Sequence, residues 1–101
     1  MPGTLDLDYR KHNRMKISVE ISMYPLDADY EPPILDFLAR LNAHNEVDVH
    51  TNSMSTQLFG EYQSVMEALS EAMELTFQQD RKVAMVFKCI NVDLSAPYVA
   101  K

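Results

Sequence analysis

Cysteine and glycine are scarce in this chain. Cys89 is the one cysteine among 101 residues, so neither an intrachain disulfide nor a metal site built from several thiolates can form. Two glycines and five prolines are too few for a low-complexity chain or one dominated by linkers. The length and the 47% hydrophobic fraction instead favour one globular domain with its own apolar core.

Basic residues are also in the minority. Nine Lys and Arg against fifteen Asp and Glu give a formal net charge of −6, which opposes binding to a phosphate backbone. The one basic run lies at residues 10–16 and has no aromatic platform on which bases could stack. We therefore interpret it as a solvated leader and expect no nucleic-acid partner.

Long apolar runs are missing as well. No segment approaches the roughly 20 apolar residues that a membrane span needs, and the polar N-terminal segment has no apolar signal core. We therefore expect a cytoplasmic protein without membrane insertion. Its expected organisation is a flexible N-terminal tail at residues 1–15, a folded domain at residues 16–95 and a C-terminal tail at residues 96–101.

Alternation of apolar and polar residues predicts the strands. Apolar residues at every second position from Ile17 to Met23 predict a first strand, which Pro25 ends. Residues 47–58 predict a hairpin with Asn52-Ser53 as its turn. Residues 82–91 predict a last strand that is apolar on both faces and therefore central in the sheet.

Helical spacing predicts two helices. The first, residues 34–43, has a core-facing stripe of Ile34, Leu35, Leu38 and Leu41. The second, residues 62–78, has a stripe of Val65, Leu69, Ala72, Met73 and Phe77. The order of elements predicts an α+β, ferredoxin-like βαββαβ fold, with a four-stranded antiparallel sheet and both helices on one face. The other sheet face is left uncovered, so we expect copies of the chain to pair there as a dimer or tetramer.

Two polar segments interrupt the apolar pattern. Residues 22–26 read SMYPL at the end of the first strand, and residues 51–61 read TNSMSTQLFGE in the hairpin. Their small hydroxyls and amides supply neutral donors and acceptors along packed elements, which is typical of a small-molecule pocket. Because Thr56 and Ser55 face opposite sides of a strand, the pocket is expected at the hairpin end or against a neighbouring subunit.

Both segments resemble the YkoF-like thiamine and hydroxymethylpyrimidine binding proteins. Members of that family carry an S-L-Y-P-L-like first strand and a T-N-x-M-S-T-x-x-x-G-E hairpin, and the similarity runs from about Ile17 to Asn91. The best-known members join two such units, and this sequence has one. The resemblance implies a non-enzymatic homo-oligomer that binds thiamine or its hydroxymethylpyrimidine moiety in thiamine salvage or transport. It also adds Asn91, which matches an asparagine of the family.

Glu20 is a carboxylate in the middle of a predicted strand, where charges are uncommon. One interpretation is an ion pair, with Lys88 on the last strand or with another subunit. The other is an acceptor for the hydrogen bonds of an aminopyrimidine. The predicted ligand-binding residues are Glu20, Ser22, Tyr24, Asn52, Ser55, Thr56 and Asn91.

The sequence shows no catalytic or metal-binding constellation. His12, His44 and His50 share no spacing suited to zinc, and the apolar neighbours of Cys89 disfavour a reactive thiolate. We therefore expect no cofactor, no metal and no catalytic residue. Two alternatives stay open: a small cofactor-free ferredoxin-like enzyme of the monooxygenase or isomerase type, and a regulatory module that senses a metabolite for a partner protein.

Overall fold

The structure is a computed structural model that describes residues 14–99. The elements are, in order, β1 (Lys16–Pro25), α2 (Glu31–Asn42), β2 (Asp48–Thr51), β3 (Thr56–Glu61), α3 (Tyr62–Phe77) and β4 (Val83–Ile90). This order confirms the predicted βαββαβ arrangement. Most of the predicted N-terminal tail and the last two residues of the predicted C-terminal tail lie outside the described residues.

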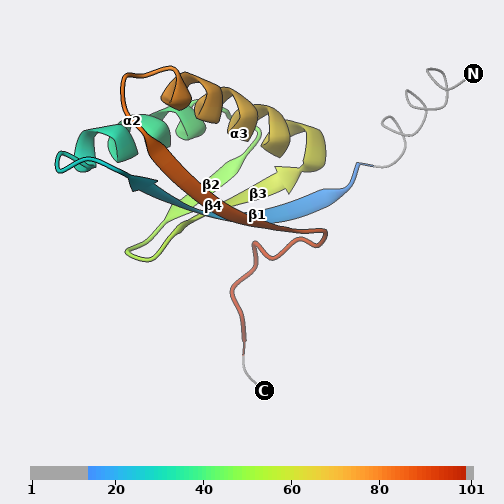
Figure 1. Ribbon diagram of the computed structural model, residues 1–101. Helices are drawn as coiled ribbons and strands as arrows, with labels where there is room; N and C mark the ends of the chain where they lie inside the picture. The colour runs from blue at the N-terminus through green and yellow to red at the C-terminus, as the bar shows by residue number, and fades with distance from the viewer. Residues whose placement is uncertain (1–13, 100–101) are drawn as a thin grey trace, which may run out of the picture.

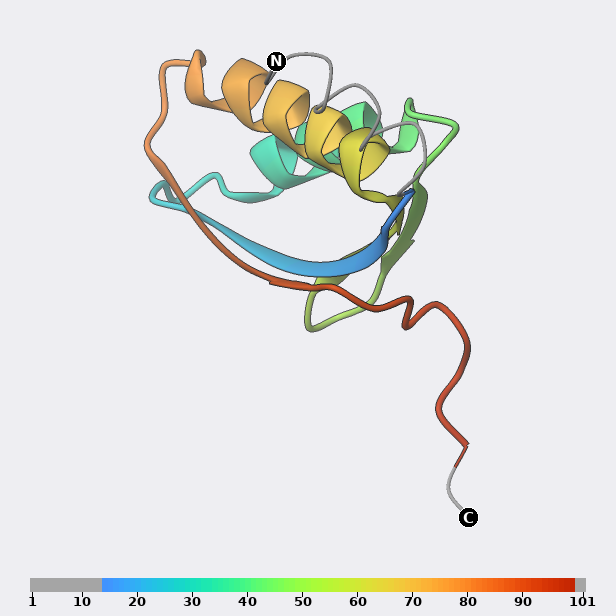
Figure 2. The ribbon, with the colours of Figure 1, turned by 90° about the vertical axis from the view of Figure 1, so that its right-hand side faces the viewer.

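The four strands form one antiparallel sheet in the order β2-β3-β1-β4. Helices α2 and α3 lie side by side on one face of it (Figure 1). The segment after β4 leaves the sheet on the opposite side, which carries no helix (Figure 2). The ferredoxin-like fold is therefore as predicted. Neither α2 nor α3, the helices of the described residues, has the length and apolar character that a membrane crossing needs.

Strand β4 lies at the edge of the sheet, so the prediction of a central last strand is wrong. Among residues 14–99, its only strand neighbour is β1. Apolar residues on both of its faces produced the prediction, because that pattern is typical of a strand buried on both sides. Here Val86 is 63% exposed and Phe87 is 43% exposed. The part of the chain that the structure describes leaves this apolar strand largely uncovered.

The core lies between the two helices and the sheet. Its largest fully buried side chains include Ile17 and Leu58 from the sheet and Phe37, Leu41 and Leu69 from the helices. These contacts hold β1 and β3 under the helix pair. They thereby fix the relative positions of β1, the hairpin loop and α2.

Both predicted helix stripes need correction. Helix α2 turns Pro33, Phe37 and Leu41, spaced four residues apart, toward the sheet, and this rotation leaves Leu35 58% exposed. Helix α3 buries Thr76 in the place predicted for Phe77, which is 50% exposed. The stripe of α3 is otherwise as predicted at Val65, Leu69 and Ala72, with Met73 partly buried.

The hairpin connection is longer than the predicted Asn52-Ser53 turn. Strand β2 ends at Thr51 and β3 begins at Thr56, so four residues form the loop. Met54, which was predicted on a strand, lies in this loop and is almost fully exposed. The longer loop reaches beyond the paired strands and forms one wall of the cavity described next.

Candidate functional site

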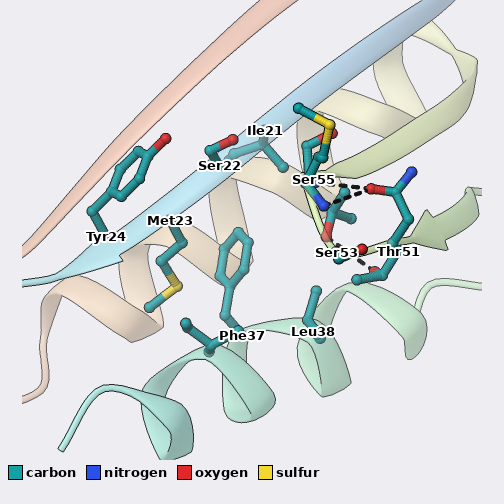
Figure 3. A pocket seen from close by; sticks show the side chains of 13 residues that line it. Ile21, Ser22, Met23, Tyr24, Phe37, Leu38, Thr51, Ser53 and Ser55 are labelled. Carbon is teal, nitrogen blue, oxygen red and sulfur yellow. Dashed lines mark hydrogen bonds between the residues drawn. The ribbon is translucent and has the colours of Figure 1, made fainter.

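A cavity of about 210 Å³ opens between the hairpin loop, the second half of β1 and α2 (Figure 3). The hairpin side contributes polar groups, residues 51–56. The helix side contributes an apolar wall of Ile34, Phe37 and Leu38. Residues Ile21 to Tyr24 of β1 complete the lining. The cavity thus combines one apolar wall with one wall of hydroxyls and amides, as small-molecule sites commonly do.

The cavity exists because β1 is longer than the part of it that pairs with β3. Thr56, the first residue of β3, lies opposite Ile21. Strand β1 continues to Pro25 and pairs over that stretch only with β4. The edge of residues 22–25 on the hairpin side therefore has no described strand beside it, and the loop and α2 surround the space that remains.

Met23 directs its backbone N–H and C=O toward this space. The N–H of Tyr62 donates to the carbonyl of Met15 over 2.8 Å, and the N–H of Leu26 donates to the carbonyl of Lys82 over 2.9 Å. In an antiparallel strand, the N–H and C=O of one residue point to the same side of the strand, and those of the next residue point to the opposite side. Odd-numbered residues of β1 therefore point toward β3. At Met23 that side is the cavity, and no described residue forms a backbone hydrogen bond with Met23 there.

Asn52 organises the hairpin loop. Its Oδ1 accepts hydrogen bonds from the backbone N–H of Met54 over 2.8 Å and of Ser55 over 3.1 Å. Its own N–H donates to the carbonyl of Ser55 over 3.1 Å. Such side-chain bonds to nearby backbone are how asparagine stabilises tight connections. Oδ1 is thus already engaged, and the Nδ2 amide group is the part of this side chain that a ligand can use.

Two further hydroxyls close the base of the loop. The hydroxyls of Thr51 and Thr56 lie 3.0 Å apart and are hydrogen-bonded across the first pair of the hairpin. Thr56 is buried. This bond lies at the bottom of the polar wall, so Thr56 supports the loop from inside the fold.

The cavity is reached around the free edge of β1. Figure 3 shows the side chains of Ser22 and Tyr24 on the side of β1 away from α2, whereas Met23 and Phe37 lie between β1 and α2. Both sides of the strand border the cavity because no neighbouring strand separates them there. The sequence led us to expect a pocket either at the hairpin end or against a neighbouring subunit. This cavity lies at the hairpin end.

Five of the seven predicted site residues line this cavity: Ser22, Tyr24, Asn52, Ser55 and Thr56. Asn91 does not, because it follows Ile90, which pairs with Ser18. Ser18 is four residues before Ser22 on β1, which corresponds to about 13 Å along a strand. The structure thus places Asn91 toward the opposite end of β1. Its proposed contact with a ligand stays a prediction.

Glu20 lies outside the cavity but is connected to it. Its Oε2 accepts a hydrogen bond from the Ser55 hydroxyl over 2.9 Å, and its Oε1 lies 3.3 Å from Nζ of Lys88. The predicted ion pair with Lys88 is therefore confirmed. The Gln57 amide also donates to the Ser55 hydroxyl over 3.0 Å. The Ser55 hydrogen bond, followed by the contact with Lys88, holds the pKa of Glu20 below its usual value.

Sequence patterns missed the remaining parts of the site. Phe37 lies outside the stripe predicted for the first helix, and Ile34 and Leu38 were interpreted only as core. Nothing in the residue type of Met23 indicates that its backbone groups are unpaired. The register of strand pairing shows it, since β1 runs past the point where the hairpin ends.

Titratable side chains are rare around the cavity. Tyr24 is the only one among the described residues that line it. Within residues 14–99, no three His, Cys, Asp or Glu side chains come together in a way that could hold a metal ion. The site offers neutral hydrogen-bonding groups and an apolar surface.

Solved structures of other proteins share this fold. A protein from Streptococcus pneumoniae is 28% identical over 79% of this chain and 90% of its own, with a TM-score of 0.69. A hypothetical protein from Methanocaldococcus jannascii is 21% identical over 84% of this chain and 89% of its own, with a TM-score of 0.68. A candidate thiamine biosynthesis/salvage protein from Thermotoga maritima is 16% identical over 74% of this chain and 82% of its own, with a TM-score of 0.66. No protein-family model and no curated protein sequence matches the chain.

Proposed function

We propose that the cavity binds the aminopyrimidine ring of hydroxymethylpyrimidine or thiamine, and that the protein carries this ligand without transforming it. The observation that carries the proposal is the free backbone edge at Met23. An aminopyrimidine presents an amine donor next to a ring-nitrogen acceptor. The N–H and C=O of one strand residue present the complementary pair side by side.

The size of the cavity supports a single ring. A dry cavity of about 150 Å³ holds one benzene molecule, so about 210 Å³ suits one ring with small substituents. Phe37 and Leu38 supply an apolar wall against one face of such a ring. Asn52 Nδ2 and the Ser22 hydroxyl are the donors of the lining proposed for its hydroxymethyl group. The thiazolium of thiamine would then lie at the mouth of the cavity.

The chemistry of the lining supports binding rather than turnover. General acid–base catalysis needs a titratable group within hydrogen-bonding reach of the reacting atom. Tyr24 is the one such group among the described lining residues, and the nearby carboxylate of Glu20 is held by Ser55 and Lys88. The resemblance of residues 22–26 and 51–61 to thiamine-binding proteins, and the fold shared with the Thermotoga protein, agree with a role in thiamine salvage or transport.

Filling the cavity tests the proposal. Leu38 is half-buried and lines the cavity, whereas Leu35 lies on the same helix and is 58% exposed outside it. Leu38→Trp places an indole where the ring would bind, and Leu35→Trp adds the same side chain elsewhere. Calorimetric titration with hydroxymethylpyrimidine should show affinity reduced at least tenfold for Leu38→Trp and unchanged within twofold for Leu35→Trp.

Circular dichroism and thermal unfolding establish that both variants fold. Equal affinity of Leu38→Trp and the original chain would remove this cavity from consideration. Absence of binding to the original chain, for both the pyrimidine and thiamine, would overturn the proposed function as a whole.

A further inference from the structure

Met54 is the most exposed methionine of the described residues. It is 89% exposed in the hairpin loop, and the next, Met15, is 38% exposed. The other described methionines are partly buried against the core: Met23, Met66, Met73 and Met85. A thioether is oxidised more readily when solvent reaches it. We therefore expect Met54 to react first when the protein meets an oxidant.

Met54 also borders the cavity. It belongs to the hairpin residues that line the cavity. Its backbone N–H donates to Oδ1 of Asn52 over 2.8 Å, and the N–H of Ser55 donates to the same oxygen over 3.1 Å. These bonds hold the loop backbone, so the side chain of Met54 starts from a fixed point beside the cavity. Methionine is common on binding surfaces because its side chain is flexible and polarisable.

The exposure of Met54 separates its chemistry from folding. A side chain that is 89% exposed buries little apolar area, and its contribution to stability is correspondingly small. A chemical change at its sulfur can therefore alter the edge of the cavity while the core and the sheet stay intact.

We propose that Met54 is a peroxide-sensitive modification site whose oxidation weakens ligand binding in the cavity, an inference that rests on the proposed function. The Sδ atom attacks one oxygen of hydrogen peroxide, and the O–O bond breaks as the S–O bond forms. The other oxygen leaves as hydroxide and takes the proton of the transferred oxygen to become water. The sulfur loses two electrons and becomes a sulfoxide, which sulfoxide reductases convert back to the thioether.

The sulfoxide changes the character of the cavity edge. A thioether is apolar and a weak acceptor, whereas a sulfoxide is polar and its oxygen accepts hydrogen bonds well. The oxidised side chain favours water over the face of an apolar ring. Its new oxygen also competes with the ligand for donors of the same loop, such as Nδ2 of Asn52. The affinity for hydroxymethylpyrimidine should therefore fall about fivefold or more.

Cys89 is the other sulfur that an oxidant reaches readily, since it is exposed. It pairs with Val19 on β4 and does not line the cavity. Cys89→Ser therefore removes thiol oxidation from the experiment without altering the lining. Both tests below use this variant as the starting protein.

Rates of oxidation provide the first test. Peptide mass spectrometry during brief treatment with hydrogen peroxide follows each methionine separately. Met54 should oxidise at least about twice as fast as Met15, in keeping with its greater exposure. Saturating hydroxymethylpyrimidine should slow the oxidation of Met54 and leave that of Met15 unchanged, because Met15 lies outside the cavity lining. Oxidation of Met54 no faster than that of Met15 would overturn the proposal.

Calorimetric titration with hydroxymethylpyrimidine provides the second test. Peroxide treatment should reduce the affinity, and reductases for both sulfoxide epimers should restore it. Met54→Leu keeps an apolar side chain without an oxidisable sulfur, so the affinity of this variant should be the same before and after treatment. Unchanged affinity of the chain oxidised at Met54, or an equal loss in treated Met54→Leu, overturns this inference and leaves the proposed function standing. Absence of binding before treatment overturns the proposed function, and this inference with it.

Discussion

The Ser55 hydroxyl donates a hydrogen bond to Oε2 of Glu20 over 2.9 Å, and this bond ties the hairpin loop to the middle of β1. Lys88 approaches the other carboxylate oxygen to 3.3 Å from β4. One carboxylate therefore connects the loop that walls the cavity with the central strand and the edge strand. Its position indicates that Glu20 acts on the site by holding Ser55.

The pH dependence of stability should reveal this role of Glu20. Hydrogen bonding to Ser55 and the contact with Lys88 lower the pKa of Glu20 in the folded chain, whereas its pKa in an unfolded chain is about 4.3. A lowered folded-state pKa gives a stabilising contribution that is present above the unfolded pKa and is lost as the pH falls through the folded pKa. Thermal unfolding should therefore show the original chain losing more stability than Glu20→Gln as the pH falls below about 5. Parallel curves for the two proteins would contradict this role.

Replacing Asn52 separates its two functions. Asn52→Ala removes the acceptor of two backbone N–H groups and should lower the free energy of unfolding by about 1 kcal/mol. Asn52→Asp keeps an oxygen in that place but removes the Nδ2 donor. It should therefore retain stability within a few tenths of a kcal/mol and lose about fivefold in affinity for hydroxymethylpyrimidine. Equal destabilisation by both variants, measured by urea unfolding, would show that Oδ1 does not organise the loop.

Two buried threonines should respond in opposite directions to the same substitution. Thr76 is 1% exposed, and its hydroxyl has no hydrogen-bond partner among residues 14–99. Thr76→Val should raise the free energy of unfolding by about 1 kcal/mol, because an unsatisfied buried hydroxyl is unfavourable. Thr56→Val removes the bond to Thr51 and should lower it by about 1 kcal/mol. Urea unfolding measures both, and a loss of stability in Thr76→Val would mean that its hydroxyl is satisfied in the folded protein.

The ranking of ligands follows from the charges around the cavity. Among residues 14–99, no Lys or Arg lines it, and the acidic Asp27, Asp29 and Glu31 follow β1 in the chain. A diphosphate binds tightly where amide donors or basic side chains gather. Thiamine should therefore bind at least as tightly as thiamine diphosphate in side-by-side titrations at low ionic strength. A preference for the diphosphate above tenfold would reveal a phosphate site that this lining does not contain.

The sequence was sufficient to predict the fold and the two polar segments that line part of the cavity. Alternation along β1 and helical spacing along α3 depend on local periodicity, and the polar residues at 22–24 and 51–56 differ in type from their core surroundings. The rotation of α2 could not be predicted, because Leu35 and Phe37 are both apolar and only packing on the sheet decides which one is buried.

Two features, the position of β4 and the free edge at Met23, depend on how the strands assemble into the sheet. The position of a strand in a sheet is not encoded in its own residues, so β4 was predicted as central from a pattern that a partner molecule can also explain. The free edge at Met23 depends on where β3 begins, and therefore on the length of the loop that Asn52 sets. Both features depend on which strands lie side by side and how far those strands extend, and periodicity records neither.

The most direct test of the cavity as the binding site is a nuclear magnetic resonance titration with hydroxymethylpyrimidine. Backbone amide signals of the ¹⁵N-labelled protein report where the ligand binds, residue by residue. Binding in the cavity should give saturable shifts that are largest at the Met23 amide and across residues 52–56, with little change at Asn91. Largest shifts around Asn91 and Ser18, or no shift at Met23 at ligand saturation, would contradict it.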